Sequence, residues 1–564
     1  MDKKQNLRRS GIKIMANLIL LLGSLAYIMI FAVINGSVGF MCAMGVTLMG
    51  AVGVAKTLGE RIVLSYGAII VLAVSCGVLR GLLRYLEQYG NHYIAFRLLA
   101  VLRDKIFAAL RELCPAKLES KKKGAIIAMI TSDIETLEVF YAHTISPICI
   151  AVIVSATAAL FVGTVSNWWL TLVALIGYCT VGILVPVIAS DKLKVSGVHY
   201  RAEFASFNAY FLDSIKGIKD IVLNNAGKER EKEVNNRSDI LLEETKKMKH
   251  DTTKAVAATE LCVSLFIIIT LAVGIFLVTK DMLTIGRMII GVVAVFSSFG
   301  SVISISALPG NLTQTFASGD RILNLLAEEP AVNPVKNGKS IEFEELVVQD
   351  LSFSYNEQTK VLNDICMYAK KGEIIGIVGE SGCGKSTFLK LLLRFWKKDK
   401  GEITYNGIDV EKIDTDSLLA NVTMVSQVTY LFDQTIEENL RIAKQNATRE
   451  EIENACKMAS IHDFILTLPN GYKTRVGALG DNLSAGEKQR IGLARAFLCG
   501  SELILLDEPT SNVDSINEGI ILKALKEQKK KKSIILVSHR ESTMAIADRI
   551  YCVDGGRMYE QSGK

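Results

Sequence analysis

The sequence contains eleven cysteines, but they are scattered singly, and no two of them form a C-x-x-C pair or show the spacing of zinc ligands. This absence argues against a structural zinc module. Five of these cysteines lie in apolar runs, where cysteine behaves as a small hydrophobic residue and is expected to stay reduced. The cysteines in apolar runs are Cys42, Cys76, Cys149, Cys179 and Cys262.

Charge is missing from long stretches of the first part of the chain. No residue from Ile14 to Ala55 is charged, which is longer than the about 20 residues that one membrane span needs. No small-residue cleavage site follows the first apolar run, so we predict an anchor and not a removed signal peptide. Across the 564 residues, 50% are hydrophobic and 22% are charged. These values fit an apolar first part followed by a soluble α/β part.

We predict six membrane spans with both ends in the cytoplasm, separated by short outer links and two long charged helical excursions. Asn35-Gly36-Ser37 is predicted to break the first apolar run, and Val38–Ala55 is either a re-entrant or outer-leaflet segment or the start of the second span. Basic residues in the N-terminal flank and in the excursions orient these parts toward the cytoplasm. We therefore attribute the net charge of +6 to membrane orientation and not to nucleic-acid binding. The spans are expected at about Ile14–Ile34, Ile62–Leu79, His143–Val165, Leu170–Ala189, Ala255–Thr279 and Ile285–Leu308.

The later part of the chain contains a glycine-rich stretch that fits the phosphate-loop pattern G-x-x-x-x-G-K-[ST]. Its residues are Gly379, Glu380, Ser381, Gly382, Cys383, Gly384, Lys385, Ser386 and Thr387. In such a loop the backbone N–H groups surround a phosphate, the lysine reaches the β- and γ-phosphates, and the serine hydroxyl ligates Mg²⁺. A strand is expected before it, at Glu373–Val378, and a helix after it, at Phe388–Leu393, so the helix N-terminus points at the anion. A structural glycine turn is the alternative, and this context favours binding of a nucleoside triphosphate.

Two carboxylates follow a strongly apolar segment further along the chain. Leu503–Asp507 is predicted to be a buried strand, which places Asp507 where Mg²⁺ or its water shell would lie. Glu508 can then polarise the attacking water as a general base. Another apolar strand is expected at Ser533–Val537, and His539 follows it.

Together these residues resemble the ATP-binding cassette of ABC transporters. The resemblance implies that Tyr355 stacks on adenine, although a tyrosine in a strand core is the alternative. It implies that Gln427, after a strand at Val422–Val425, contacts Mg²⁺ or the attacking water, and that His539 contacts the γ-phosphate. Asn512–Asp514 resembles the D-loop, which crosses to a partner subunit.

The stretch Leu483-Ser484-Ala485-Gly486-Glu487 resembles the family's signature sequence, whose usual form is Leu-Ser-Gly-Gly-Gln. A helix predicted at Lys488–Leu498 would offer its N-terminus to the γ-phosphate of an ATP held on another subunit. Ala485 adds a methyl group where close backbone approach is expected, so full competence of this half-site is left open. The stretch Thr474–Ala478 resembles the family's coupling loop but lacks both of its acidic residues.

The resemblance covers nearly the whole chain and implies an all-α transmembrane domain of the exporter type, followed by an α/β P-loop NTPase domain. The predicted limits are 1–13 for a basic cytoplasmic N-terminus, 14–320 for the transmembrane domain, 321–340 for a linker and 341–564 for the nucleotide-binding domain. The resemblance implies ATP and Mg²⁺ as cofactors, a second half-transporter as partner, and a small-molecule substrate. Export is favoured; the alternatives are import of the siderophore or haem type on the same fold, and a regulatory membrane ATPase.

Some residues of the first part resemble one subgroup, the CydC-type half of heterodimeric thiol exporters. These are Arg84–His92, Phe96–Leu99, Leu102-Arg103, Ile145–Pro147 and Glu487. The resemblance favours a heterodimer. It also links His92 to haem, although Gln88 replaces a basic residue of the subgroup, and an unliganded interfacial histidine is preferred. Glu260 is a candidate cavity residue, and serines of the sixth span either line a polar path or allow close helix packing. Cys114–Gly124 and Phe211–Ile221 are expected to be coupling helices.

Overall fold

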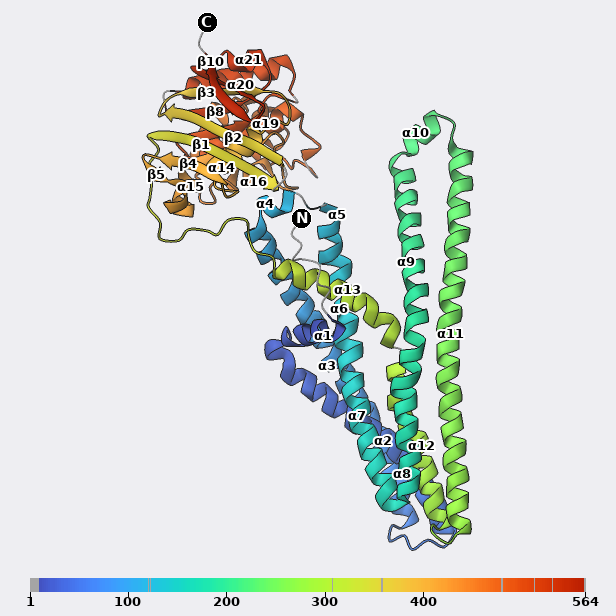
Figure 1. The fold of residues 1–564 in the computed structure, drawn as a ribbon. Helices are drawn as coiled ribbons and strands as arrows, with labels where there is room; N and C mark the ends of the chain where they lie inside the picture. Colours follow the sequence, from blue (N-terminus) through green and yellow to red (C-terminus); the bar gives the residue numbers. More distant parts are fainter. Residues whose placement is uncertain are drawn as a thin grey trace. The chain divides into compact units, whose positions relative to one another are not determined.

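The computed structural model describes residues 10–561 except 120, 122, 307, 357, 358, 478, 479, 512 and 530. Most of the predicted basic N-terminus, residues 1–9, therefore lies outside the described part of the chain. The chain forms two compact units, drawn in Figure 1. Of the described residues, the helical unit contains those up to Glu112 and those within Lys121–Glu328, and the α/β unit contains those within Leu113–Ser120 and Glu329–Lys564.

The helical unit consists of long helices interrupted by three π-helical turns, η2, η3 and η4. Its elements are α1 (Gly11–Leu20), η1 (Gly23–Leu25), α2 (Ala26–Thr57), α3 (Tyr66–Leu113), α5 (Lys123–Ala128), η2 (Met129–Asp133), α6 (Ile134–Phe140), η3 (Tyr141–Ile145), α7 (Ser146–Val165), α8 (Trp168–Cys179), η4 (Thr180–Leu184), α9 (Val185–Lys216), α10 (Ile218–Leu223), α11 (Gly227–Thr279), α12 (Ile285–Ser306) and α13 (Leu308–Leu326).

Six helical stretches of the described chain are long and apolar enough to cross a membrane, which confirms the predicted number of spans. Each of four stretches extends well beyond the length of a span, because a charged continuation of the same helix follows or precedes the apolar part. The six membrane-spanning stretches are Gly23–Thr57, Tyr66–Leu113, Gly124–Val165, Trp168–Lys216, Gly227–Thr279 and Ile285–Ile305.

The predicted break at Asn35-Gly36-Ser37 is wrong, because helix α2 passes through it without interruption. The Asn35 side-chain amide donates to the Phe31 carbonyl 2.8 Å away, so it is satisfied inside the helix. Gly36 is a packing position: a Cβ there would lie 2.3 Å from Cδ1 of Ile150 on α7. The chain bends earlier instead, between α1 and α2, where Gly23 has a positive φ of 47°. The first span is therefore shifted toward the C-terminus relative to the prediction.

The second charged excursion is a long hairpin in which α9 and α11 run side by side and α10 lies at their tip (Figure 1). Helix α9 stays helical to Lys216, and the chain turns at Gly217. Near this tip the guanidinium groups of Arg230 and Arg237 lie 3.7 Å and 4.2 Å from the ring centroid of Tyr210. These cation–π contacts join the two helices.

The serines of the sixth span contribute to packing inside the helical unit. Ser298 and Ser301 on α12 are both 1% exposed, and each hydroxyl donates to a carbonyl three residues earlier. Tyr178 on α8 also shares a hydrogen bond with Ser298. Glu260, in contrast, lies on an exposed face of α11. A polar path along these residues stays a prediction.

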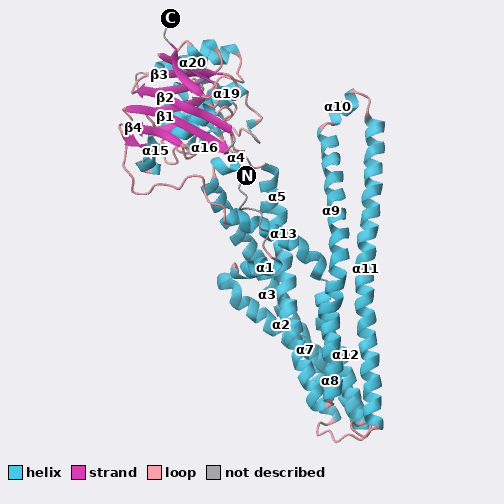
Figure 2. Ribbon diagram, viewed as in Figure 1, coloured by secondary structure: helices cyan, strands magenta, loops and turns pink. Residues whose placement is uncertain are grey.

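The α/β unit contains two sheets (Figure 2). The four-stranded sheet has the order β2-β1-β4-β5, and the six-stranded sheet has the order β10-β9-β3-β8-β7-β6. In the larger sheet β9, β3, β8, β7 and β6 are parallel. The strands are β1 (Glu345–Asn356), β2 (Thr359–Lys370), β3 (Ile374–Gly379), β4 (Lys400–Tyr405), β5 (Ile408–Asp409), β6 (Val422–Val425), β7 (Leu503–Asp507), β8 (Ser533–Val537), β9 (Arg549–Asp554) and β10 (Arg557–Gln561).

Both faces of the larger sheet are covered, which explains why its central strands are apolar without alternation. Leu503 and Leu505 of β7 belong to one buried cluster, whereas Ile504 and Leu506 belong to another on the opposite face. The predicted fold class, a helical membrane domain and an α/β nucleotide-binding domain, is confirmed. The helices of this unit are α4 (Ala116–Glu119), α14 (Lys385–Leu392), α15 (Thr415–Asn421), α16 (Ile436–Arg441), α17 (Arg449–Met458), α18 (His462–Thr467), α19 (Ala485–Cys499), α20 (Ser515–Gln528) and α21 (Glu541–Met544), with short turns η5 (Val410–Lys412) and η6 (Gly471–Lys473).

Candidate functional site

The phosphate loop connects the end of β3 to the start of α14. Helix α14 begins at Lys385, three residues before the predicted start, because Gly384 at its N-cap already adopts φ 105°. Gly382 has φ 84°, so both glycines hold conformations that a residue with a side chain rarely adopts. Glu380 and Ser381 are exposed at the loop tip. The loop therefore presents backbone N–H groups next to a helix N-terminus, the arrangement that binds phosphate.

Lys385 and Ser386 lie where the sequence pattern predicts. The Lys385 ammonium donates to the carbonyls of Gly379 and Glu380, at 2.8 Å and 2.7 Å, so it is folded over its own loop. Cys383 contributes its thiol to the same cluster, with Sγ 3.7 Å from the ammonium nitrogen. The Ser386 hydroxyl donates to Asp507 Oδ1 at 2.8 Å.

The adjacent oxygens of Ser386 and Asp507 are a donor set that fits Mg²⁺, which prefers hydroxyl, carboxylate and phosphate oxygens. Asp507 ends β7 and is 7% exposed. Burial raises the pKa of this carboxyl above its ordinary value, and the nearby Glu508 charge adds to the rise, while the Ser386 hydrogen bond opposes it. A cation at this position would relieve the cost of the buried charge.

Glu508 is held between two side chains from neighbouring strands. Gln427 Nε2 donates to Glu508 Oε2 at 3.0 Å, and His539 Nδ1 lies 3.3 Å from Glu508 Oε1. Gln427 follows β6, Glu508 follows β7 and His539 follows β8, and these three strands are parallel neighbours in the sheet. Their carboxyl ends therefore meet at one edge, as expected for a ligand site in a parallel sheet. Glu508 has a positive φ of 48°, a strained conformation for this residue type.

Tyr355 stands beside the phosphate loop and is not a buried strand-core residue. Its ring is 43% exposed, and its hydroxyl shares a 2.9 Å hydrogen bond with Thr387. Trp396 and Phe353 contact the ring edge-to-face, with centroids 5.0 Å and 4.9 Å away. No pattern in the sequence points to Trp396, whose ring packs against Tyr355 and orients it. An exposed, oriented aromatic ring next to the loop can stack on a base.

The signature sequence forms the start of α19, which begins at Ala485 and not at the predicted Lys488. Ser484 is the N-cap and makes a capping box with Glu487: Ser484 N donates to Glu487 Oε2 at 2.8 Å, and Glu487 N donates to Ser484 Oγ at 3.3 Å. Glu487, which stands where the family's usual signature has glutamine, thus stabilises the start of the helix. Ser484 and Ala485 are exposed. Gly486 is buried against Asn517, where a Cβ would lie 2.9 Å from Cγ.

Two further predicted segments are described only in part. Asp514 is the N-cap residue of α20 and is exposed, and the hydrogen bond from Asn517 lowers its pKa. Asn512 lies outside the described residues. The predicted coupling loop pairs with Gln434–Ile436: Ile436 N donates to the Thr474 carbonyl at 3.0 Å, and Val476 N donates to the Gln434 carbonyl at 3.1 Å. Ala478 also lies outside the described part.

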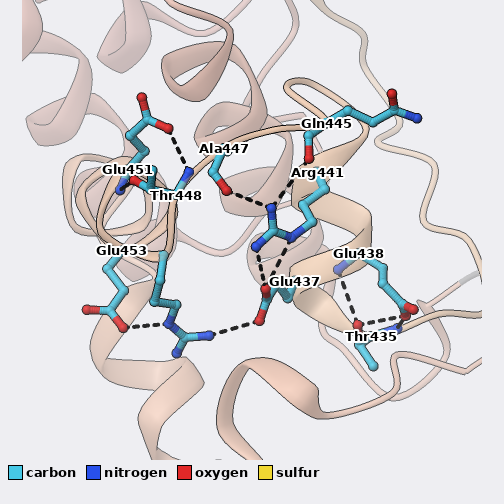
Figure 3. A network of polar contacts seen from close by, with 10 residues as sticks. Thr435, Glu437, Glu438, Arg441, Gln445, Ala447, Thr448, Glu451 and Glu453 are labelled. Atoms are coloured by element: carbon cyan, nitrogen blue, oxygen red, sulfur yellow. Dashed lines mark hydrogen bonds and ion pairs between the residues drawn. The ribbon is translucent and has the colours of Figure 1, made fainter.

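A polar network stabilises the helices that follow Gln427 in the chain (Figure 3). Glu437 accepts from Arg441 at 2.7 Å and from Arg449 at 3.0 Å, and Arg449 also donates to Glu453 at 2.7 Å. Thr435 and Thr448 form capping boxes at the starts of α16 and α17. The network fixes α16 against α17, which packs on α19.

His92, the predicted haem candidate, lies in the helical unit with Nδ1 4.0 Å from Glu138 Oε1. Its ring meets His143 edge-on, with centroids 5.4 Å apart. Among the described residues, no group of three or more His, Cys, Asp or Glu side chains is arranged to hold a metal ion. The two roles expected for His92, a haem ligand or an unliganded interfacial histidine, stay predictions.

Comparison with known proteins agrees with this architecture, in which a phosphate-loop ATPase accompanies a bundle of membrane-spanning helices. Residues 25–302 match the family described as ABC transporter transmembrane region, and residues 362–511 match the family described as ABC transporter. A Haemophilus influenzae protein described as a "Probable ABC transporter ATP-binding/permease protein" is 46% identical over 553 residues, covering 98% of this chain and 100% of that protein.

Two more similarities extend the comparison. A Bacillus subtilis protein named as a candidate multidrug export ATP-binding/permease protein is 29% identical, covering 86% of this chain and 83% of its own length. The solved structure of a bacterial Atm1-family ABC exporter with ATP bound has a TM-score of 0.79 at 24% identity, covering 96% of this chain and 95% of that one. That structure shows a shared fold.

The chain belongs to the ABC transporter family. It is a half-transporter, with one transmembrane region and one ATP-binding cassette, and it is an ATPase coupled to transmembrane transport. It is a multi-pass protein of the cell membrane, with the ATP-binding domain on the cytoplasmic side. The finer resemblance to CydC-type subunits stays a prediction.

Proposed function

We propose that this chain is one half of a dimeric exporter that uses ATP hydrolysis to move a small solute out of the cytoplasm. The observation that carries the proposal is the position of Glu508. It directly follows Asp507, which accepts from Ser386 of the phosphate loop, and its carboxylate contacts both Gln427 and His539, at 3.0 Å and 3.3 Å. A general base, an amide that orients water and an imidazole at the phosphate are the groups that hydrolysis of the γ-phosphate requires.

In this mechanism the backbone of residues 379–384 and the Lys385 ammonium bind the β- and γ-phosphates, while Tyr355 stacks on adenine. Gln427 orients the attacking water, Glu508 accepts its proton, and His539 donates a hydrogen bond to the γ-phosphate. Mg²⁺, when bound with the nucleotide, would be held by Ser386, Asp507 and Gln427 and would neutralise phosphate charge. Positioning and charge stabilisation then account for most of the catalysis.

Dimerisation is supported by the exposed start of α19. Ser484 and Ala485 are exposed, together with Asp514. These groups would meet ATP bound to another subunit, whose γ-phosphate the helix N-terminus would stabilise. Because Ala485 replaces the usual glycine, we infer a partner with its own, different signature, and hence a heterodimer.

The proposed domain limits are 14–320 for the membrane domain, 321–340 for the linker and 341–564 for the nucleotide-binding domain. Export of a small solute is supported by the name of the Bacillus subtilis relative, a multidrug export protein, and by the exporter with which this chain shares its fold. Import on the same fold would use the same ATP chemistry. The direction of transport therefore needs an experiment of its own.

The experiment reconstitutes the full chain with its partner in lipid vesicles that expose the ATP-binding domains to the outside. We expect ATP to drive accumulation of candidate solutes inside, whereas Glu508→Gln should still bind ATP but hydrolyse it about a thousand-fold more slowly and accumulate nothing. Glu502→Gln, at the opposite end of β7, is the matched control and should behave as wild type. Transport by the Glu508→Gln protein at the wild-type rate would refute ATP-driven pumping, and ATP-driven loss of solute from loaded vesicles would indicate import.

A further inference from the structure

A buried polar network connects the segment that follows Glu508 to the segment that contains His539. Its centre is the Glu518 carboxylate, in the first turn of α20. Glu518 Oε2 accepts from Arg540 NH1 at 2.7 Å, and Glu518 Oε1 accepts from Ser542 Oγ at 2.6 Å and from Thr543 Oγ1 at 3.1 Å. All three donors follow His539 in sequence.

The burial of this network shows that its contacts are not those of an ordinary surface ion pair. Glu518 is 6% exposed, and Thr543 is fully buried. Thr543 also shares a 3.1 Å hydrogen bond with Thr510, which is 1% exposed and lies two residues after Glu508. A buried carboxylate is costly unless donors surround it. Here both oxygens have donors, so the network fixes one relative position of the two segments.

The guanidinium group of Arg540 extends the network to the backbone of the loop after Glu508. NH2 donates to the Ser511 carbonyl at 3.2 Å, and NH1 has a longer contact of 3.5 Å with the Val513 carbonyl. The planar fork of arginine can bind a carboxylate and backbone carbonyls at the same time, which a lysine ammonium does less well. On its other side, Ser511 accepts from Gln427 Nε2 at 3.4 Å.

We propose that Arg540 and Glu518 are positioning residues for ATP hydrolysis, which hold Thr510, Ser511 and the His539 backbone in register with Glu508. The inference rests on the proposed roles of Glu508 and His539. Arg540 is the next residue after His539, and Ser511 N donates to the Glu508 carbonyl at 3.2 Å. A shift of Arg540 is therefore expected to move both His539 and the segment that is hydrogen-bonded to Glu508. Misplacement of a catalytic group by about 1 Å can slow a reaction about a hundred-fold.

A second arginine–glutamate pair of the same unit is a matched control. Arg549 on β9 donates to Glu560 on β10, with Nε–Oε1 at 2.7 Å and NH2–Oε2 at 2.9 Å. Arg549 also donates to the Tyr368 carbonyl and to the Tyr551 hydroxyl, which lie on strands of the sheets, and it lies 3.8 Å from Glu373. This pair has similar geometry and charge and joins two strands of the fold.

The test compares Arg540→Lys and Glu518→Gln with Arg549→Lys and Glu560→Gln in the reconstituted full-length transporter. We expect kcat for ATP hydrolysis to fall about 10- to 100-fold for Arg540→Lys and by a smaller factor for Glu518→Gln, with KM for ATP changed less than about two-fold. The control variants should keep the wild-type kcat. Melting midpoints should be similar in all four variants; this control is needed because a loss of folded protein would also lower the apparent kcat without changing KM.

The inference is overturned if Arg540→Lys and Glu518→Gln hydrolyse ATP at the wild-type rate, if the control pair loses as much activity, or if neither of the two variants folds. Glu508→Gln measured in parallel separates the two hypotheses. If Glu508→Gln is inactive while Arg540→Lys is normal, only the positioning role fails. If Glu508→Gln hydrolyses ATP normally, the proposed catalytic assignment fails.

Discussion

The two units of the chain place their apolar side chains in opposite ways. In the α/β unit every residue of β7 and β8 is buried. In the helical unit, only 6% of the residues in the most apolar segment of Tyr66–Leu113 are buried. In the most apolar segment of Gly227–Thr279, 22% of the residues are buried. A water-soluble protein would not expose so much apolar surface. The helical unit is built for a solvent that is itself apolar.

The polar contacts differ in the same way. The α/β unit contains networks that join several loops, including those around Glu437 and Glu518. In the helical unit many hydroxyl groups donate to a carbonyl of their own helix, as Ser301 and Thr270 do. Lipid offers no hydrogen bonds, so a membrane helix must satisfy its polar groups internally. Water allows the α/β unit to place charged groups at its surface and to use some of them for chemistry.

The comparison is tested most strongly by placing the same charge on an exposed leucine of each unit. Leu265 in α11 is 52% exposed and Leu419 in α15 is 42% exposed. Leu265→Arg should hinder membrane insertion by about 3 kcal/mol, whereas Leu419→Arg should change stability by less than about 0.5 kcal/mol. The yield of membrane-inserted, folded protein measures the difference. Equal yields from the two variants would show that the exposed face of α11 does not meet lipid.

A smaller effect is expected at the ion pair that joins η2 to α13 in the helical unit. Arg321 Nε donates to Asp133 Oδ2 at 2.7 Å, and Ser318 Oγ donates to Asp133 Oδ1 at 2.9 Å. Arg321 is 54% exposed in its side chain, so solvent weakens the pair. Asp133→Asn should therefore cost about 1 kcal/mol and lower the melting midpoint by about 2–4 °C.

A double-mutant cycle checks this value. Arg321→Gln in the Asp133→Asn background should add little further destabilisation, because the pair is already broken. If the two substitutions were fully additive, the ion pair would not be the source of the stability.

An effect of similar size but opposite sign is expected for Asp507→Asn. Burial is the main cause of the raised pKa of Asp507. The raised pKa means that the Asp507 carboxyl group binds its proton more tightly in the folded protein than in the unfolded chain. The charged carboxylate therefore destabilises the nucleotide-free fold at pH 7, and this cost disappears as the pH falls through the raised pKa. Asp507→Asn should raise the melting midpoint at pH 7 by roughly 2–4 °C, the shift that about 1 kcal/mol produces.

The pH dependence of melting distinguishes this cause from a general effect of removing charge. The gain from Asp507→Asn should shrink as the pH is lowered toward 4, the region of the ordinary aspartate pKa. Asp399→Asn, at an exposed position, should show no such trend. A gain that stays constant with pH would mean that burial of the charge is not the reason.

Much of the ATP site could be predicted because its signals are local. The phosphate loop depends on glycines at fixed spacing before a helix, and the strand that ends at Asp507 and is followed by Glu508 depends on six consecutive residues. Helix starts were less predictable. Both α14 and α19 begin three residues earlier than expected, because the cap residues Gly384 and Ser484 let the helix start directly after the loop. The break in the first apolar run was misplaced because glycine in a membrane helix can mark close packing as well as a turn.

The sequence by itself determined that the chain has six apolar membrane-spanning stretches and a phosphate loop, because each of these is written in neighbouring residues. Only the tertiary structure decided that Gln427, Glu508 and His539 meet at one edge and that Arg540 and Glu518 connect the segments around them. These residues are far apart along the chain. What brings them together is the order of β6, β7 and β8 in the sheet, which depends on packing against both of its faces and not on any local pattern.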